Sequence, residues 1–482
     1  MILINNISET WKIMKVSLKI SSILLGICAV PNVWSSERPN ILIIVADDLG
    51  WGDVGYHNPE ILTPNIDRLS KEGIVLNRFY SAPMSSPTRA GLMTGRYQDR
   101  YGLRHVVIRP WFDYGLDPQE KILPQVLADA GYKHRGIIGK WHLGHSRPEY
   151  HPLRRGFTCF YGHMNGAIDY FDHTRTGELD WHKGFKTSYD KGYSTDLITG
   201  KAVHFIHRYY KQSPFFLYVA YNAPHSPLQA QEKYLVQNGY DKNMPAFQNG
   251  PGKGNTMRQT FAAMVTNLDA GIGDILHTLE QLSIANKTIV LFLSDNGADL
   301  SLGGSNGELR GGKLTEWEGG MRVPAIIRWP EQLTGGWESS QVTGCVDVLP
   351  TLCDLIGYQP GSDMQLDGIS ISPVLKKESG RIDRNLYLGC GTVVNSEWKL
   401  IKQHTKRGLS RMVIHEDLLF SMSLDPCEAV NVRDEQGKIY QELLDVLSVY
   451  ESIEPTMTPP PDQRPADFVP PKEWDIRHHR KR

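Results

Sequence analysis

Four short apolar runs constrain the fold of this chain more than any other feature of its sequence. Each run is nearly continuous, as expected for parallel strands that are covered on both faces of a sheet. Segments with the apolar periodicity of helices separate them, and the clearest extends from Phe261 to Leu282. This alternation predicts an α/β fold with a doubly wound sheet flanked by helices. The predicted strands cover residues 40–46, 134–139, 214–220 and 288–294, and two further predicted helices cover 63–73 and 120–131.

Reactive side chains follow each predicted strand. Ligands of open α/β sheets bind outside the carboxyl ends of the strands, so we expect these side chains to meet in one crevice. Taken singly, an Asp pair or an Asp-Asn-Gly stretch is typical of a turn, and a buried His of a satisfied core residue. Their coincidence at four strand ends favours a functional site. The residues are Asp47 and Asp48 after the first strand, Lys140 and His142 after the second, His225 after the third, and Asp295 and Asn296 after the fourth.

The acidic members of this set indicate a metal site. Asp47, Asp48, Asp295 and Asn296 offer hard oxygen atoms, which suit Ca²⁺ or Mg²⁺, whereas a zinc pair needs several His ligands. We expect one divalent cation, with calcium favoured.

The stretch SSPTRAGLMTGR at residues 85–96 has the features of a helix start next to an anion. Pro87 suits the first helical turn because it has no amide hydrogen to leave unpaired. Ser85 then lies at the positive end of the helix, and Arg89 can donate two hydrogen bonds to a tetrahedral oxyanion. By itself, a Ser-Ser-Pro stretch is an ordinary helix start.

Taken together, the motifs resemble those of the formylglycine-dependent sulfatases. SSPTRAGLMTGR fits their C/S-x-P-x-R signature with its downstream TGR, and GKWHLG at 139–144 resembles their second signature. ADDLGWGDVG, APHSPL, SDNG and LRGGKLTEWEGGMRVP are also similar, so the resemblance covers residues 38–450. Within the family, GRYQDRYGLRH and RRGFTCFYGHMNGAIDYFDH resemble the N-acetylgalactosamine-4-sulfatase (arylsulfatase B) group.

The resemblance implies an alkaline phosphatase-like fold and a set of residue roles. Ser85 would be oxidised to formylglycine, and Arg89 would hold its hydrated form. His225, aided by Lys313, would be the general acid, and His142 the base. Lys140, His142, His225 and Lys313 would surround the sulfate; Asp47, Asp48, Ser85, Asp295 and Asn296 would bind calcium. Many members carry Cys where this chain has Ser85, which implies maturation by a serine-type formylglycine-generating enzyme.

The resemblance also suggests a substrate. We expect a sulfated galactose or N-acetylgalactosamine at the end of an oligosaccharide or polysaccharide chain. Ala167 falls at a position where relatives have a serine near the substrate. The resemblance is therefore a weaker guide to the sugar-binding residues than to the rest of the site. The candidates for sugar contact are Arg104, His105, Asp169, Tyr170 and His173, each of which also suits a surface loop. Two alternatives stay open: a phosphomonoesterase or phosphodiesterase of the alkaline phosphatase superfamily, and an inactive protein that binds sulfated glycans.

Composition and the two ends complete the sequence-based picture. A net charge of −1 gives no global field for nucleic acid or an acidic membrane. Residues 1–36 have the pattern of a signal peptide whose apolar run is too short to span a bilayer, with Met14 as a candidate start, so we expect a periplasmic or secreted protein. Because of Cys28, attachment through a lipid anchor stays an alternative.

The rest of the chain is predicted to have three parts. They are a catalytic domain at 37–364, a C-terminal subdomain with a small antiparallel sheet and a helix at 365–454, and an irregular proline-rich tail at 455–482 that buries little.

Overall fold

A computed structural model describes residues 38–404 and 409–476. The predicted signal peptide, Cys28 and the basic end of the tail lie outside the described residues. From Arg38 onward the chain forms one compact unit. Of the helices in the described ranges, none has both the length and the apolar character that a membrane span requires.

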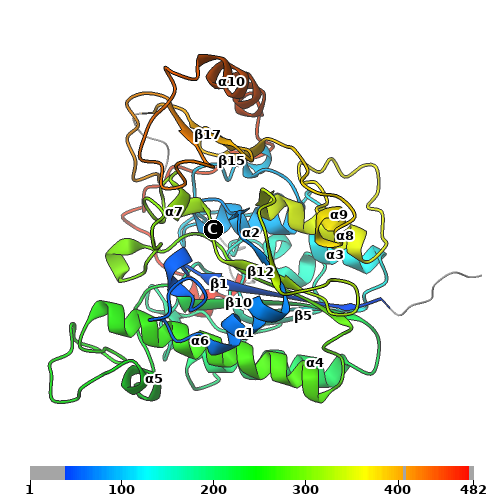
Figure 1. The fold of residues 1–482 in the computed structure, drawn as a ribbon. Coiled ribbons are helices and arrows are strands. Elements are labelled where there is room, and N and C mark those ends of the chain that lie inside the picture. Colours follow the sequence, from blue (N-terminus) through cyan, green and yellow to red (C-terminus); the bar gives the residue numbers. More distant parts are fainter. Residues whose placement is uncertain (1–37, 405–408, 477–482) are drawn as a thin grey trace, which may run out of the picture. The chain divides into compact units, whose positions relative to one another are not determined.

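The four predicted strands form the centre of a ten-stranded sheet, in the order β11, β1, β10, β4, and all four are parallel. Antiparallel pairing of β12 with β11 makes the sheet mixed. The predicted doubly wound architecture is confirmed (Figure 1). In order across the sheet, the strands are β13 (Trp337–Ser339), β2 (Ile74–Leu76), β12 (Ala325–Arg328), β11 (Thr288–Ser294), β1 (Asn40–Asp47), β10 (Phe215–Pro224), β4 (His134–Lys140), β5 (Cys159–His163), β8 (His182–Lys183) and β9 (Lys186–Thr187).

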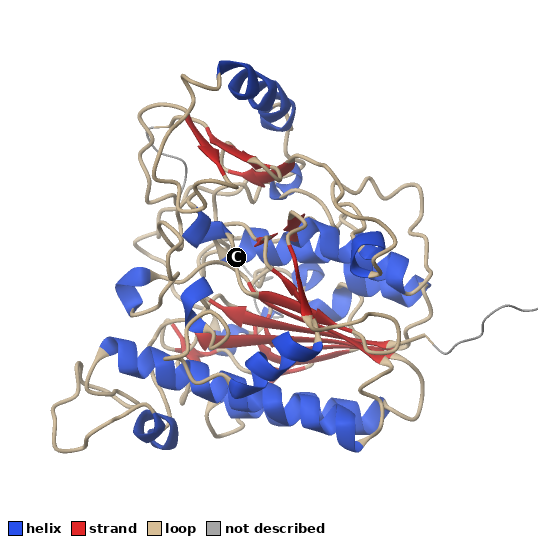
Figure 2. Ribbon diagram, viewed as in Figure 1, coloured by secondary structure: helices blue, strands red, loops and turns tan. Residues whose placement is uncertain are grey.

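Helices cover both faces of this sheet, which explains why the central strands are apolar throughout (Figure 2). Successive side chains of a strand point to opposite faces. Accordingly Ile41, Ile43 and Val45 join one core, whereas Leu42 and Ile44 join the other. The first core includes α2 (Ser85–Thr94), α3 (Leu123–Asp129), α8 (Val348–Leu355) and α9 (Ser372–Leu375); the second includes α1 (Pro64–Glu72), α4 (Ser194–Tyr209), α5 (Glu232–Gln237) and α6 (Met257–Gln281).

The C-terminal region contains the predicted small antiparallel sheet and helix. The sheet has four strands, of which β16 was not predicted from the sequence, and α10 packs on β16 and β17. Two short strand pairs and one short helix complete the α-helices and strands of the described residues. The bounds are β15 (Leu386–Gly389), β16 (Thr392–Val394), β17 (Trp398–Ile401), β18 (Leu418–Ser421) and α10 (Gly437–Glu451); β3 (Phe79–Tyr80) pairs with β14 (Thr343–Gly344), β6 (Thr174–Arg175) pairs with β7 (Glu178–Leu179), and α7 spans Glu318–Met321.

The described part of the proline-rich tail is irregular except for a 3-10 turn at Lys472–Trp474. The prediction that this tail buries little is wrong at its end, where Trp474 is 1% and Ile476 7% exposed. Asp462 also pairs with Arg109, with 2.8 Å between its Oδ1 and the arginine Nε. The tail is therefore anchored along the surface by apolar burial and by an ion pair.

Candidate functional site

The carboxyl ends of the central strands bring the predicted residues together. Asp47 ends β1, Lys140 ends β4, His225 follows β10 and Asp295 follows β11. Asp48 and His142 have φ angles of 67° and 56°, in the left-handed region that non-glycine residues seldom adopt. Backbone strain of this kind persists where surrounding structure enforces it, and it is concentrated at functional sites.

Three carboxylates and an amide form the buried floor of the site. Asp47 and Asp295 are 0% exposed and Asp48 is 2% exposed. The amide N of Asp48 donates to Asp295 Oδ1 at 3.2 Å, and Asn296 Nδ2 donates to Asp48 Oδ1 at 2.8 Å. Next to them, a Cβ at Gly297 would lie 1.8 Å from the carbonyl oxygen of Gly319. The glycine of the SDNG motif is thus required by a close approach of the backbone of α7.

Each carboxylate has its own cationic partner. Arg89 donates from Nε and Nη2 to Asp295 Oδ2 at 3.0 and 2.7 Å. Lys140 Nζ lies 2.6 Å from Asp47 Oδ2, and Lys313 Nζ lies 2.7 Å from Asp48 Oδ2. The role predicted for Arg89, holding the group on residue 85, stays a prediction, because Arg89 hydrogen-bonds to Asp295 and to the carbonyl of Lys140 and lies 3.8 Å from Asp47 Oδ1.

The pKa values reflect this crowding of like charges. Burial, together with the charge of Asp295, raises the pKa of Asp47 to about 7. Burial acts in the same direction on Asp48, but the charges of Lys313 and His225, together with hydrogen bonds from Lys313 and Asn296, outweigh it and lower the pKa of Asp48 to about 2. Burial lowers the pKa of Lys140 to about 8 even though Asp47 opposes the shift.

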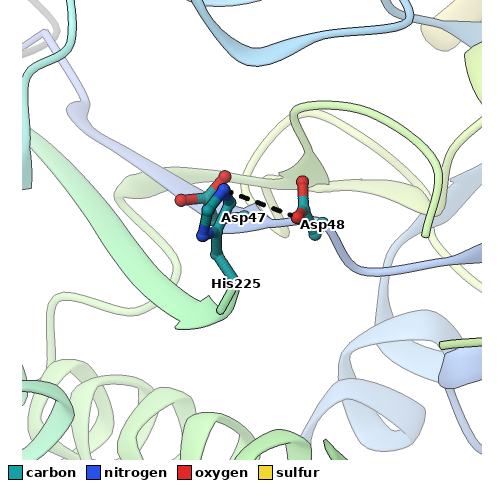
Figure 3. A group of neighbouring side chains, drawn as sticks. All are labelled: Asp47, Asp48 and His225. Carbon is teal, nitrogen blue, oxygen red and sulfur yellow. Dashed lines mark ion pairs between the residues drawn. The ribbon is translucent and has the colours of Figure 1, made fainter. Parts of the chain in front are cut away.

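This donor set fits a divalent cation held by oxygen. Ligand atoms of Asp47, Asp48 and His225 lie within 4.8 Å of one another (Figure 3), and the negative charges of Asp295 and Asp48 add repulsion to the effect of burial on Asp47. A hard cation would relieve that repulsion. His225 adds one nitrogen near the group, with Nε2 3.7 Å from Asp48 Oδ2. The residues that would hold the ion are Asp47, Asp48, Asp295 and Asn296, with the side chain at position 85 beside them.

The structure distinguishes the two serines at the start of α2. Ser85 Oγ lies 3.2 Å from Asp47 Oδ1, 3.4 Å from Asn296 Oδ1 and 3.4 Å from Lys140 Nζ. Ser86 Oγ points elsewhere: it donates to the carbonyl of His142 at 3.1 Å and accepts from the amide of Ile108. Ser85 therefore faces the carboxylates, and Ser86 joins two loops.

The two histidines differ in which ring nitrogen contacts a backbone carbonyl and which one does not. Because a carbonyl only accepts, His142 donates from Nε2 to Ile108, and its buried Nδ1 has no hydrogen-bond partner among the described residues. His225 lies with Nδ1 2.6 Å from the carbonyl of Ser226, which leaves Nε2 toward Asp48. Burial lowers the pKa of both rings, to about 3 for His225. A Cβ at Gly166 would lie 2.4 Å from His142 Nε2, so this glycine makes room for the ring.

A cavity of about 180 Å³ opens from this floor. Ser85, His142, His225 and Lys313 line it, as does Ala167. Four charged residues of the lining were not predicted from the sequence, because they belong to loops and to a short hairpin with no recognisable motif: Arg109, Arg175, Asp299 and Arg411.

The five residues predicted to contact the sugar do not line this cavity. Their side chains support the surrounding loops, and their role in sugar contact stays a prediction. Tyr170, for example, is fully buried with its hydroxyl 2.8 Å from the carbonyl of His225. Arg104 pairs with Asp99, His105 Nδ1 lies 3.1 Å from Cys390 Sγ, Asp169 accepts from the amides of Phe171 and Asp172, and His173 Nε2 lies 2.9 Å from the carbonyl of Gly192.

Comparisons with known proteins agree with this geometry. Human N-acetylgalactosamine-6-sulfatase is 37% identical over 377 residues, which cover 73% of this chain and 68% of the relative. Mouse arylsulfatase J is 36% identical over 358 residues, covering 72% of this chain and 58% of the relative. The crystal structure of Ps i-CgsB in complex with k-i-k-neocarrahexaose has a TM-score of 0.76 and 30% identity, covering 87% of this chain and 94% of that one.

The chain thus spans between 58% and 68% of the length of these two curated relatives. The sequence motifs favoured the 4-sulfatase group, whereas one of these relatives is a 6-sulfatase, so the family is shown and the position of the sulfate is not. The family model described as Sulfatase matches residues 39–358. This chain therefore belongs to the sulfatase family, a family of sulfuric ester hydrolases.

Proposed function

We propose that the protein is an exo-acting carbohydrate sulfatase. It hydrolyses sulfate monoesters of galactose or N-acetylgalactosamine at the ends of sulfated glycans, with formylglycine made from Ser85 and one calcium ion. The observation that carries the proposal is the position of Ser85 Oγ, at the start of α2, between the carboxylates and Lys140 and facing the cavity with both histidines. The substrate class is supported by the similarity to N-acetylgalactosamine-6-sulfatase and to Ps i-CgsB, whose structure contains k-i-k-neocarrahexaose.

The overall reaction adds water across the sulfate ester and yields a free sugar hydroxyl and hydrogen sulfate. Hydrated formylglycine supplies a hydroxyl that attacks sulfur and a second one whose deprotonation releases the sulfate. Calcium, when bound, supplies positive charge at the ester oxygens. The chain supplies the remaining charges: the ammonium groups of Lys140 and Lys313 stabilise the negative charge that develops on the sulfate oxygens.

The histidines suit the two proton transfers. His142 is neutral with a free Nδ1 lone pair, which is the form that a base needs. His225 is also neutral in the free protein, since burial and Lys313 lower its pKa to about 3. A bound anionic ester raises that pKa, so His225 acquires the proton that it gives to the leaving sugar oxygen when substrate arrives.

Mass spectrometry and one matched pair of variants test the proposal. The protein is isolated from its native host or from cells that also produce a serine-type maturation enzyme. The peptide that contains residue 85 should be lighter than the serine form by one molecule of H₂. Ser85→Ala should abolish sulfate release without lowering the melting temperature, whereas Ser86→Ala should keep most of the activity, because Ser86 joins loops and does not face the carboxylates.

Unchanged turnover by Ser85→Ala would exclude this residue as the source of the nucleophile. Zinc bound at near two ions per chain, with phosphate esters as substrates, would favour the phosphatase alternative. Retention of sulfated glycans without sulfate release, by protein from the native host whose Ser85 is unmodified, would favour the binding protein. The proposed periplasmic or secreted location is tested by fractionating the native host.

A further inference from the structure

Arg175 differs from the other cationic residues of the cavity. Arg109 pairs with Asp462, Lys313 with Asp48 and Arg411 with Asp299. In the described ranges no carboxylate lies within ion-pair distance of the Arg175 guanidinium, and its buried Nε has no hydrogen-bond partner. Burial lowers the pKa of Arg175, and Asp180 offsets this only in part. An unpaired, largely buried cation is costly, so it is expected where a ligand completes the pair.

A rigid hairpin presents this side chain to the cavity. β6 and β7 are joined by Thr176 and Gly177, whose φ angles of 51° and 90° are those of a tight two-residue turn. The side chain of Trp474, from the C-terminal tail, donates from Nε1 to the carbonyl oxygen of Arg175 at 3.0 Å. The amide of Glu473 donates to Glu178 Oε2 at 2.9 Å. The tail therefore fixes both strands of the hairpin.

The nearby carboxylate of Asp180 is already fully engaged. It accepts hydrogen bonds from the amides of Met164 and Asn165, from Asn165 Nδ2 and from His182 Nε2, all between 2.9 and 3.0 Å. These bonds hold the loop that leads to Gly166 and Ala167 in the lining of the cavity. Asp180 consequently positions this loop and leaves the guanidinium of Arg175 available.

The reacting sulfate has its own set of partners in the ammonium groups of Lys140 and Lys313 and in the two histidines. Arg175 is additional to that set, and it comes from β6, which contributes none of those four residues. We propose that Arg175 binds a second anionic group of the substrate, a sulfate or a carboxylate carried by the same or the adjacent sugar; this inference rests on the proposed sulfatase function. A planar guanidinium suits both groups because each accepts two parallel hydrogen bonds.

Substrates that differ in one anionic group test this inference. The probes are N-acetylgalactosamine 4-sulfate, its 6-sulfate, its 4,6-disulfate, and a uronic acid-containing disaccharide with one sulfate. The matured wild-type protein should show kcat/KM at least about tenfold higher for one of the two doubly charged probes than for the monosulfates. The doubly charged probe with the higher kcat/KM shows whether the second group is a sulfate or a carboxylate.

Arg175→Gln should remove that preference by lowering kcat/KM for the preferred probe at least about tenfold and for the monosulfates by less. Arg381→Gln is the matched control, because Arg381 is exposed in the C-terminal region and pairs with Asp383. Trp474→Phe keeps an aromatic ring but deletes the hydrogen bond to Arg175, so it should lower the preference in the same direction and by less. Melting temperatures show whether each variant is folded.

Equal losses on all four probes by folded Arg175→Gln, or a wild-type protein without any preference for a second charge, would overturn the role of Arg175. In both cases the monosulfates are still hydrolysed, so the sulfatase function stands. If matured wild-type protein releases sulfate from none of the probes nor from 4-nitrophenyl sulfate, the proposed function itself fails.

Discussion

Two clusters of buried charge lie near α7, and they differ in what surrounds them. The first is the floor of the cavity, with three carboxylates and three cations. The second joins α7 to the C-terminal sheet: Lys399 Nζ lies 3.0 Å from Glu318 Oε1 and 2.8 Å from Glu428 Oε1, and all three residues are 0% exposed. We call this second cluster the interdomain triad.

The interdomain triad is closed, whereas the cavity floor is open. The amide of Glu318 donates to Glu428 Oε2 at 2.6 Å, and the hydroxyl of Tyr80 donates to Glu318 Oε2 at 3.0 Å. The floor has Ser85 and Lys313 at the edge of a cavity instead. Buried charge therefore does not identify a functional site by itself. The cavity floor differs from the triad because its oxygen atoms converge on a space that a ligand can enter.

The largest effect is expected from a change on the cavity floor. Asp295→Asn should lower kcat/KM at least about a thousandfold, because it removes a charge that pairs with Arg89 and an oxygen ligand of the proposed ion. Bound calcium, measured by atomic absorption after dialysis, should fall with it. Asp269→Asn is the control, since Asp269 is equally buried but caps the start of α1. Full activity of Asp295→Asn would contradict the assignment of the floor.

A change in the interdomain triad should affect stability and not chemistry. Lys399→Met leaves two buried carboxylates without their shared cation and should lower the free energy of unfolding by about 3 kcal/mol, with kcat of the folded fraction within about twofold. Lys402→Met is the control: this lysine is a partly exposed neighbour that pairs with Glu451, so its loss should be below about 1 kcal/mol. Urea titration and activity of the same samples provide both measurements. Lost activity at unchanged stability would show that the triad belongs to the catalytic machinery.

The same comparison explains what the sequence could predict. The sheet and the ends of its strands were predictable because each strand is a continuous apolar run and its reactive residues follow directly in the chain, as with Asp47 after β1. Arg175 could not be predicted as a functional residue, although it lies two residues beyond the predicted His173. Its importance depends on burial and on the absence of a partner in the described structure, which the local sequence does not reveal. The hairpin that carries it is held by Trp474, almost 300 residues away, through a hydrogen bond to the carbonyl oxygen of Arg175.

The interdomain triad was unpredictable for the same reason. Glu318 belongs to the motif resembling the family, but Lys399 and Glu428 lie in short strands and turns whose contacts are set by how the C-terminal sheet docks. The tail shows the limit of composition: proline-rich sequence predicts irregular backbone, which is found, but it does not predict whether a single aromatic residue such as Trp474 is buried.

The smallest effect is a pH dependence of stability that belongs to the triad. Burial raises the pKa of Glu428 from its ordinary 4.5 to about 7, so the folded state keeps a proton that the unfolded chain releases. Its contribution to stability is therefore fully present below pH 4.5 and is lost as the pH rises through 7. Glu428→Gln cannot release this proton. The free energy of unfolding of the wild type, relative to this variant, should fall by about 1 to 3 kcal/mol between pH 4.5 and 7.5. Glu442→Gln, at an exposed position of α10, should follow the wild type, and parallel curves for wild type and Glu428→Gln would show that Glu428 is ionised throughout.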